Sequence, residues 1–232
     1  MKKFLLYLGF LLVCALLVIP PFISKPIENN VLNFSLNISS IIILIISLIL
    51  FYFYEFTENQ LIKITFFQLL LNIGKVFLYF GILIAVQTSL SLLGYLFNCE
   101  SNVKIQFEKN VFNFVSAFLM LGISAFYEEV LYRLYLPSTL KIFFDDLLNK
   151  VFNKTDDKKK EKCKKIVNLI IELSVIIIFG FSHLYLGVIP VLNGIICGFV
   201  LRYCCIKNKT VITGTASHWL YNCFIFIAAI SL

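Results

Sequence analysis

A small set of ionisable side chains interrupts stretches of sequence that are otherwise apolar. Glu128, Glu129 and Arg133 lie in one such stretch, and the chain's two histidines, His183 and His218, lie in two others. An ionisable group in a membrane span is energetically costly unless it has a partner, so each of these is a candidate functional residue. Carboxylates and imidazoles transfer protons, and together they indicate general acid–base chemistry.

Helical spacing separates the two neighbouring glutamates. Glu129 and Arg133 are four residues apart, so they share a helix face and can form an ion pair. Glu128 points to the face of Tyr132 and has no local cation. We therefore expect Glu129 to be the paired carboxylate and Glu128 to be the free one, available for proton exchange.

Two further helix faces carry polar groups. His218 and Asn222 are four residues apart, as are Phe179 and His183, and Glu172 lies in the same stretch as His183. The three polar faces could converge on one cavity. The alternative is that these residues only hold helices together through hydrogen bonds, a role that Ser, Thr and Asn usually fill.

The composition indicates a membrane protein. Of the 232 residues, 60% are hydrophobic and only 14% are charged, whereas about a quarter are charged in soluble domains. The apolar stretches lack the alternation of a membrane β-barrel, so helices are expected. The sequence predicts an all-α polytopic bundle of seven or eight transmembrane helices. The net charge of +7 lies mostly between the apolar stretches, so no nucleic-acid partner is expected.

Seven apolar stretches are candidate spans, at about 4–19, 36–56, 66–97, 111–136, 166–186, 191–205 and 211–232. The first is expected to be a retained helix and not a cleaved signal peptide. The third is long enough to tilt or break near Gly81, Pro137 is expected to end the fourth, and Gly187 and Pro190 to form a turn. Residues 141–165 are expected to form an amphipathic helix followed by a solvated charged insert. Residues 1–110 would form an N-terminal helical region, and residues 111–232 a catalytic core.

The basic residues between these stretches predict the orientation. Seven spans place the termini on opposite sides of the membrane. One side would carry most of the basic residues: Lys2, Lys3, Lys63, the cluster within 141–165, Arg202, Lys207 and Lys209. The other side would carry only Lys25, Lys104 and Lys109. The positive-inside rule then predicts a cytosolic N-terminus. Separately, the heavy use of Phe, Ile, Asn and Lys suggests a bacterial protein and therefore a bacterial plasma membrane.

Together the polar motifs resemble a known family, the CPBP family of CAAX proteases and bacteriocin-processing (Abi-type) enzymes. The run from Glu128 to Arg133 resembles its EExxxR motif, Phe179 to His183 its FxxxH motif, and His218 to Asn222 its HxxxN motif. The resemblance covers about residues 111–230. The charged insert lengthens the gap between the first two motifs.

The resemblance implies an intramembrane endopeptidase acting on a peptide or protein substrate, with or without a lipid anchor. By this resemblance Glu128 would be the general base that activates water, and His183 would help to position that water. His218 and Asn222 would form an oxyanion hole. Glu129 and Arg133 would support the site.

Three alternatives stay open at this point. No cofactor is favoured, but Zn²⁺ held by Glu128, His183 and His218 could activate the water instead, although the spacing is not HExxH. A non-catalytic immunity or scaffold protein could keep the motifs for packing. A transporter is less favoured because no inverted repeat is evident. Span positions also put the two imidazoles at depths that differ by roughly 10 Å, unless the helices tilt or the fifth helix begins below the interface.

Overall fold

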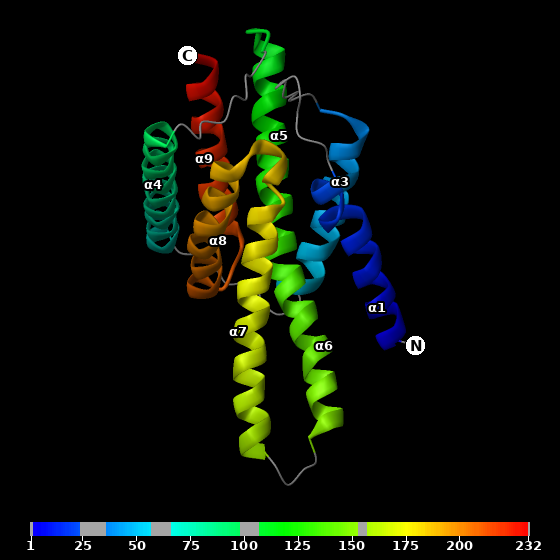
Figure 1. Cartoon of the computed structure of the whole chain (residues 1–232). Helices are drawn as coiled ribbons and strands as arrows, with labels where there is room; N and C mark the ends of the chain where they lie inside the picture. The colour runs from blue at the N-terminus through cyan, green and yellow to red at the C-terminus, as the bar shows by residue number, and fades with distance from the viewer. Residues whose placement is uncertain (1, 24–35, 57–65, 98–106, 153–156, 232) are drawn as a thin grey trace.

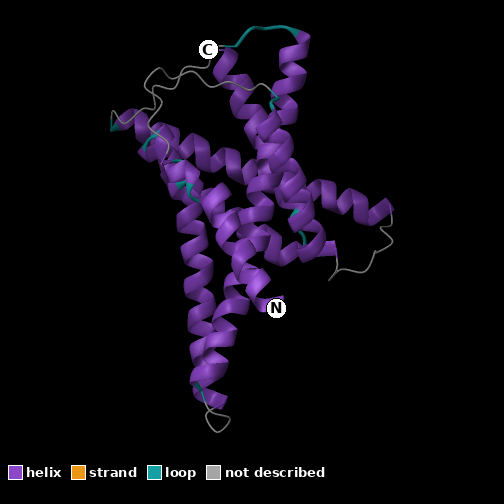
Figure 2. Cartoon of the chain, turned by 90° about the vertical axis from the view of Figure 1, so that its right-hand side faces the viewer, coloured by secondary structure: helices purple, strands orange, loops and turns teal. Residues whose placement is uncertain are grey.

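The chain forms a bundle of long helices (Figure 1). This computed structural model describes residues 2–23, 36–56, 66–97, 107–152 and 157–231. Figure 2 shows helices and loops and no strand within these residues, so the all-α class is confirmed for this part of the chain. Lys63, Lys25 and Lys104, on which part of the predicted orientation depends, lie outside the described residues.

The helices follow one another in a simple order. They are α1 (Lys2–Val13), η1 (Cys14–Val18), α2 (Pro20–Ile23), α3 (Ile38–Phe51), η2 (Tyr52–Phe56), α4 (Phe66–Leu96), α5 (Val111–Glu129), η3 (Val130–Tyr135), α6 (Leu136–Val151), α7 (Asp157–Phe181), η4 (Leu184–Leu186), α8 (Val188–Asn208) and α9 (Ile212–Ser231). The segments η1, η2 and η3 are π-helical turns that continue their neighbours, and η4 is a 3₁₀ turn.

Within the described residues, five helical stretches are long and apolar enough to cross a membrane. They are 38–55, 70–96, 111–151, 158–186 and 188–208, and a shorter apolar helix covers 7–23. The helix α9, which carries His218 and Asn222, is not among the five. The protein is therefore an integral membrane protein, and the expected count of seven or eight spans is not confirmed. Isoleucines such as Ile38 and Ile45 on α3 are exposed on the outside of the bundle, where lipid would cover them.

The prediction that Pro137 ends the fourth span is wrong. The helix runs from α5 through η3 into α6, with Pro137 buried in the first turn of α6. Proline lacks the N–H that would bond the carbonyl four residues earlier, which is that of Arg133. Arg202, on α8, donates from Nη1 to this carbonyl instead. A residue far along the chain thus supplies the missing donor.

Two other predicted boundaries also differ, and of the tilt or break expected near Gly81 the break is absent. The helix α4 passes through Gly81 without a break, because one glycine in a helix costs only about 1 kcal/mol. The charged insert is helical from Asp157, so α7 begins nine residues before the predicted residue 166. Lys164 pairs with Asp145 on α6 at 2.7 Å, which stabilises this extension. Gly187 forms the turn with φ 113°, but Pro190 lies inside the first turn of α8.

The packing of the helices sets α5, α7, α8 and α9 around a common centre. The helix α7 packs against α8, α5 against α9, and α4 against both α8 and α9. Figure 1 shows that the α6–α7 hairpin extends beyond the end of α8. The N-terminus lies toward the same end as the hairpin tip, and the C-terminus lies at the opposite end.

A buried carboxylate fixes the start of α9. Glu55, at the end of the α3–η2 helix, accepts hydrogen bonds from the Thr210 hydroxyl and from the Val211 N–H. The positive end of a helix dipole favours such an anion. Glu55 lies within a predicted span, so the scan for ionisable groups could have found it. By holding the first turn of α9, Glu55 fixes the height at which His218 enters the bundle.

Candidate active site

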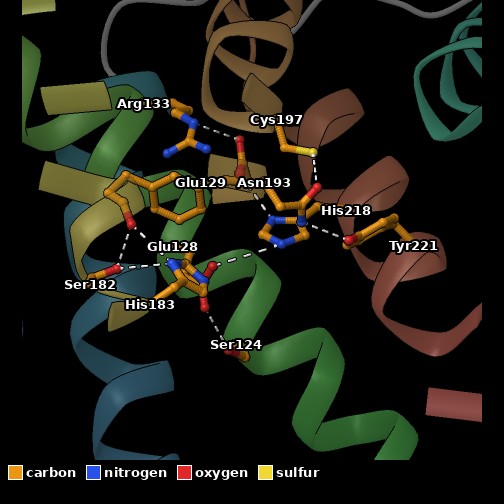
Figure 3. Close-up of polar contacts among 11 residues, drawn as sticks. Ser124, Glu128, Glu129, Arg133, Ser182, His183, Asn193, Cys197, His218 and Tyr221 are labelled. Atoms are coloured by element: carbon orange, nitrogen blue, oxygen red, sulfur yellow. Dashed lines mark hydrogen bonds and ion pairs between the residues drawn. The ribbon is translucent and has the colours of Figure 1, made fainter. Parts of the chain in front are cut away.

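Glu129 is the buried centre of the polar cluster, as Figure 3 shows. Its side chain is 0% exposed. Oε1 lies 3.1 Å from His218 Nδ1, and Oε2 lies 3.5 Å from Arg133 Nε. The i,i+4 pair predicted from the sequence is therefore present, and the same carboxylate also reaches α9. Because a carboxylate only accepts, His218 Nδ1 carries the hydrogen and Nε2 faces the other way.

Arg133 has an aromatic ring as its second partner. Its guanidinium carbon lies 3.9 Å from the centre of the Phe179 ring, and its side chain is 1% exposed. A cation over a ring face gains about 2 kcal/mol or more when desolvated. Phe179 also contacts Tyr132 in an edge-to-face arrangement with centroids 5.1 Å apart. The first residue of FxxxH therefore stabilises the last residue of EExxxR.

Glu128 occupies a different face, as its position in the helix predicts. Oε1 accepts a hydrogen bond from Ser124 Oγ at 2.9 Å. Oε2 lies 3.8 Å from His218 Nε2, is buried, and has no hydrogen-bond partner among the described residues. The side chain as a whole remains 17% exposed. Glu128 therefore offers one free carboxylate oxygen toward an imidazole (Figure 3).

His183 lies just beyond the end of α7. Its Nδ1 is 3.0 Å from the Phe179 carbonyl and 3.3 Å from Ser182 Oγ. A carbonyl cannot donate, so Nδ1 donates to it and Nε2 is left as an acceptor. No hydrogen bond joins His183 to Glu128 or His218 within the described chain.

The two imidazoles nevertheless share a neighbour. The Phe179 ring centre lies 5.0 Å from that of His183 and 6.5 Å from that of His218. The early start of α7, at Asp157, means that this helix begins below the expected position. A lower start of this helix is one of the two arrangements, with tilt, that could reduce the expected difference in depth between the histidines.

Asn222 is half-buried on α9, one turn after His218. In the described residues it makes no hydrogen bond to the rest of the cluster, so its predicted role stays a prediction. Asn193 on α8 lies in the cluster instead (Figure 3). Its Nδ2 donates to the Tyr221 hydroxyl at 2.9 Å, and its Oδ1 accepts from Cys197 Sγ at 3.3 Å. Asn193 and Ser124 are polar but not ionisable, so their residue types alone did not mark them as candidates.

Glycines allow the helices around the site to approach closely. A Cβ on Gly194 would lie 3.0 Å from Gly180 Cα and 3.4 Å from His183 Nδ1. A Cβ on Gly214 would lie 3.2 Å from Glu129 Oε2. Gly194 and Gly198 are four residues apart, the spacing of the GxxxG pattern that brings membrane helices together. That pattern was a readable signal for the α7–α8 contact.

The arrangement of the predicted metal ligands does not fit a three-ligand zinc site. Glu128 and His218 face each other, and the contacts of His183 Nδ1 with Phe179 and Ser182 leave its Nε2 without a hydrogen bond to Glu128 or His218 in the described part of the chain. Among the described residues, no group of three or more His, Cys, Asp or Glu side chains is placed to hold a metal ion. A structural zinc site normally has four protein ligands and a catalytic one three.

The polar groups of the cluster can move a proton. A free carboxylate oxygen beside an imidazole can accept a proton from a bound water molecule, and a neighbouring imidazole can donate to developing negative charge. The second carboxylate, Glu129, fixes the tautomer of His218, as carboxylates do for catalytic histidines. The arrangement is therefore suited to hydrolysis.

Residues 110–224, about half of the chain, match the model of the family described as "Rce1-like: Type II CAAX prenyl endopeptidase Rce1-like". The matched segment contains α5 to α8, most of α9 and every residue of the polar cluster named above. The chain matches no curated protein and no solved structure.

The glycine contact between α7 and α8 gives a test of the packing. In Gly180→Ala the new Cβ would lie 2.3 Å from Ile195 Cγ1 and 3.0 Å from the Ile195 N and Val191 O backbone atoms. We expect overpacking to lower the free energy of unfolding by about 1–3 kcal/mol, measured as a lower melting temperature in detergent. Gly74→Ala, where a Cβ meets nothing within 4 Å, is the matched control. Equal melting temperatures for the two variants would contradict the packing described.

Proposed function

This chain belongs to the Rce1-like family of type II CAAX prenyl endopeptidases, and on that premise we propose that it cleaves peptide bonds at the membrane with water activated by Glu128. The family match supports the general conclusion that the protein is an intramembrane CAAX-type endopeptidase. The mechanism rests mainly on one observation: Glu128 Oε2 is buried, has no hydrogen-bond partner in the described residues, and lies 3.8 Å from His218 Nε2.

The first proposed step is the activation of water. A water molecule beside Glu128 Oε2 donates a hydrogen bond to it, and Ser124 holds the other carboxylate oxygen in place. Glu128 takes the proton as the water oxygen attacks the carbonyl carbon of the scissile peptide bond. His183 Nε2, an acceptor because Nδ1 donates to the Phe179 carbonyl, can accept the second hydrogen of the water.

The second proposed step is stabilisation of the tetrahedral intermediate. Its oxyanion needs a donor, and protonated His218 supplies one from Nε2. The buried Glu129 carboxylate, 3.1 Å from His218 Nδ1, holds the ring so that Nε2 faces the site. Asn222, one turn further along α9, is proposed as the second donor.

The third proposed step is breakdown of the intermediate. Glu128, now protonated, gives its proton to the peptide nitrogen as the C–N bond breaks. The products are a free carboxylate and a free amine, and the Glu128 carboxylate is restored. Water supplies both the oxygen and the protons, so the reaction needs no further reactant.

The unpartnered polar atoms argue against a purely structural role. Buried polar groups that only hold helices together are normally satisfied, because each unmade hydrogen bond costs about 1–3 kcal/mol. Here one oxygen of Glu128 and the two Nη atoms of Arg133 lack a hydrogen-bond partner within the described residues, while Glu129 Oε2 and Arg133 Nε meet only as an ion pair at 3.5 Å. This pattern favours a catalytic site that binds water and substrate, and it disfavours a non-catalytic immunity or scaffold protein.

The proposed substrate is a peptide or protein held at the membrane. The family description names CAAX prenyl endopeptidases, so a prenylated C-terminal segment is the first choice. A bacteriocin precursor is the second. In both cases the segment around the scissile bond must reach a site enclosed by α5, α7, α8 and α9.

The catalytic role of Glu128 is tested by Glu128→Gln, which keeps the shape of the side chain. We expect the cleavage rate of a prenylated peptide to fall by about 10²–10⁴-fold, the contribution typical of a general base, with the melting temperature preserved. Glu161→Gln, on the exposed first turns of α7, removes the same charge elsewhere and should leave the rate unchanged. Cleavage by Glu128→Gln at the wild-type rate would rule the mechanism out. Absence of cleavage by the wild-type protein would favour the scaffold alternative.

A zinc-bound water is the alternative form of the same reaction, with Glu128, His183 and His218 as the ligands. Because no group of three or more His, Cys, Asp or Glu side chains is placed to hold a metal ion among the described residues, we propose the metal-free form. We expect purified enzyme to keep its cleavage rate after treatment with a chelator and to hold much less than one zinc ion per chain. Loss of activity on chelation, restored by added Zn²⁺, would instead assign the water to a metal.

We further propose that the N-terminus and the α6–α7 hairpin face the cytosol of a bacterial plasma membrane. The lysine-rich start of α7 lies at the same end of the bundle as the N-terminus (Figure 1). Cys163, a free cysteine within that segment, reports its side. With Cys99 replaced by Ser, an impermeant maleimide should label Cys163 only after the cells are opened. Cys163→Ser should abolish the labelling, and labelling in intact cells would reverse the orientation.

A further inference from the structure

Arg202 connects α7 and the α5–α6 junction through hydrogen bonds from all three of its side-chain nitrogens. This residue lies on α8 with its side chain 13% exposed. Its Nε and Nη2 donate to the two carboxylate oxygens of Glu172 on α7. Its Nη1 donates to the backbone carbonyl of Arg133. A planar guanidinium can make these bonds at once because its donors form a rigid fork.

The Arg133 carbonyl needs this donor for a definite reason. Pro137, four residues later, has no N–H to offer, and the π-helical turn η3 places this carbonyl at the junction between α5 and α6. A buried carbonyl without a partner costs about 1–3 kcal/mol. Cys205 Sγ also lies 3.9 Å from this carbonyl, but a thiol is a weak donor. Arg202 therefore fixes the main chain at the last residue of the EExxxR motif.

We propose that Arg202 is a positioning residue for the peptidase reaction, acting through the Arg133 main chain on the geometry of Glu128 and Glu129. This inference rests on the proposed function. Arg133 follows Glu129 by one turn, and its guanidinium pairs with Glu129, which in turn holds His218. A shift of the Arg133 backbone therefore moves both the free carboxylate and the imidazole that faces it.

The ion pair with Glu172 orients the Arg202 guanidinium. The bond from Arg202 to the Arg133 carbonyl is the contact proposed to affect catalysis. Glu172 has a second cation, Lys141 of α6, whose Nζ also binds Oε1. Lys141 touches Glu172 but makes no described bond to the Arg133 carbonyl. Removing Lys141 therefore weakens the same ion cluster while leaving the carbonyl capped. This makes Lys141 a matched control for the two possible roles of Arg202.

The experiment compares Arg202→Met with Lys141→Met in the full-length protein, purified in detergent, with kcat and KM measured on a prenylated peptide. For Arg202→Met we expect kcat to fall about 10²-fold, the effect of a misplacement of about 1 Å at the reacting groups, with KM unchanged. For Lys141→Met we expect kcat within about twofold of wild type, because the carbonyl donor remains. Added guanidinium ion should restore part of the kcat of Arg202→Ala, whereas sodium at equal ionic strength should not.

Arg202→Lys covers the case in which Arg202→Met does not fold. Lysine keeps the charge but lacks the fork, so it can hold Glu172 or the carbonyl in good geometry but not both, and we expect kcat between those of wild type and Arg202→Met. Arg202 variants that match Lys141→Met in kcat, or that lose only melting temperature and folded yield, would overturn the inference alone. An inactive wild-type enzyme would overturn the proposed function and this inference with it.

Discussion

The structure of this family member is organised around one constraint, the burial of the Glu129 carboxylate between α5 and α9. A charge in such a place persists only with partners. Arg133 and His218 supply them, one from the same helix and one from α9. The need to bring α9 this close explains the missing side chain at Gly214, since a Cβ there would lie 3.2 Å from Glu129 Oε2. Glu55 fixes the start of the same helix.

Burying Glu129 leaves its neighbour free. Adjacent residues on a helix point about 100° apart, so the carboxylate that is used for structure cannot compete with Glu128 for the same partners. The division of labour between the two glutamates is therefore a consequence of helix geometry. His218 joins the two roles, because one ring nitrogen is held by Glu129 and the other faces Glu128. The incomplete hydrogen bonding that results is costly for folding, and the proposed mechanism depends on it.

Much of the site could be predicted from the sequence because its key contacts are local. The pairing of Glu129 with Arg133 and the separate face of Glu128 follow from helical spacing alone. The contribution of Phe179 is not predictable in this way, because its contact with Arg133 depends on how α7 crosses η3. The carbonyl donor Arg202 is also distant in sequence, so Pro137 was wrongly predicted to end a helix.

Other parts of the fold could not be predicted from the sequence, because they also depend on contacts between distant residues. The lysine-rich start of α7 is helical because Lys164 finds Asp145 on the neighbouring helix, and a charge run read alone predicts a solvated loop. Asn193 enters the polar cluster through Tyr221 on α9, a contact that no local spacing indicates. Asn222 shares a face with His218, as the spacing predicts, but the spacing says nothing about whether a partner lies opposite.

The most direct measurement of the central claim is an experimental structure of the Glu128→Gln protein with an uncleaved peptide bound. The account places the scissile carbonyl between residue 128 and His218, with its oxygen in hydrogen-bond reach of the imidazole and a water molecule about 3–3.5 Å from its carbon, held by the residue 128 side chain. A peptide bound elsewhere, or a Glu129 side chain released from Arg133 and His218 to meet the scissile bond itself, would contradict it.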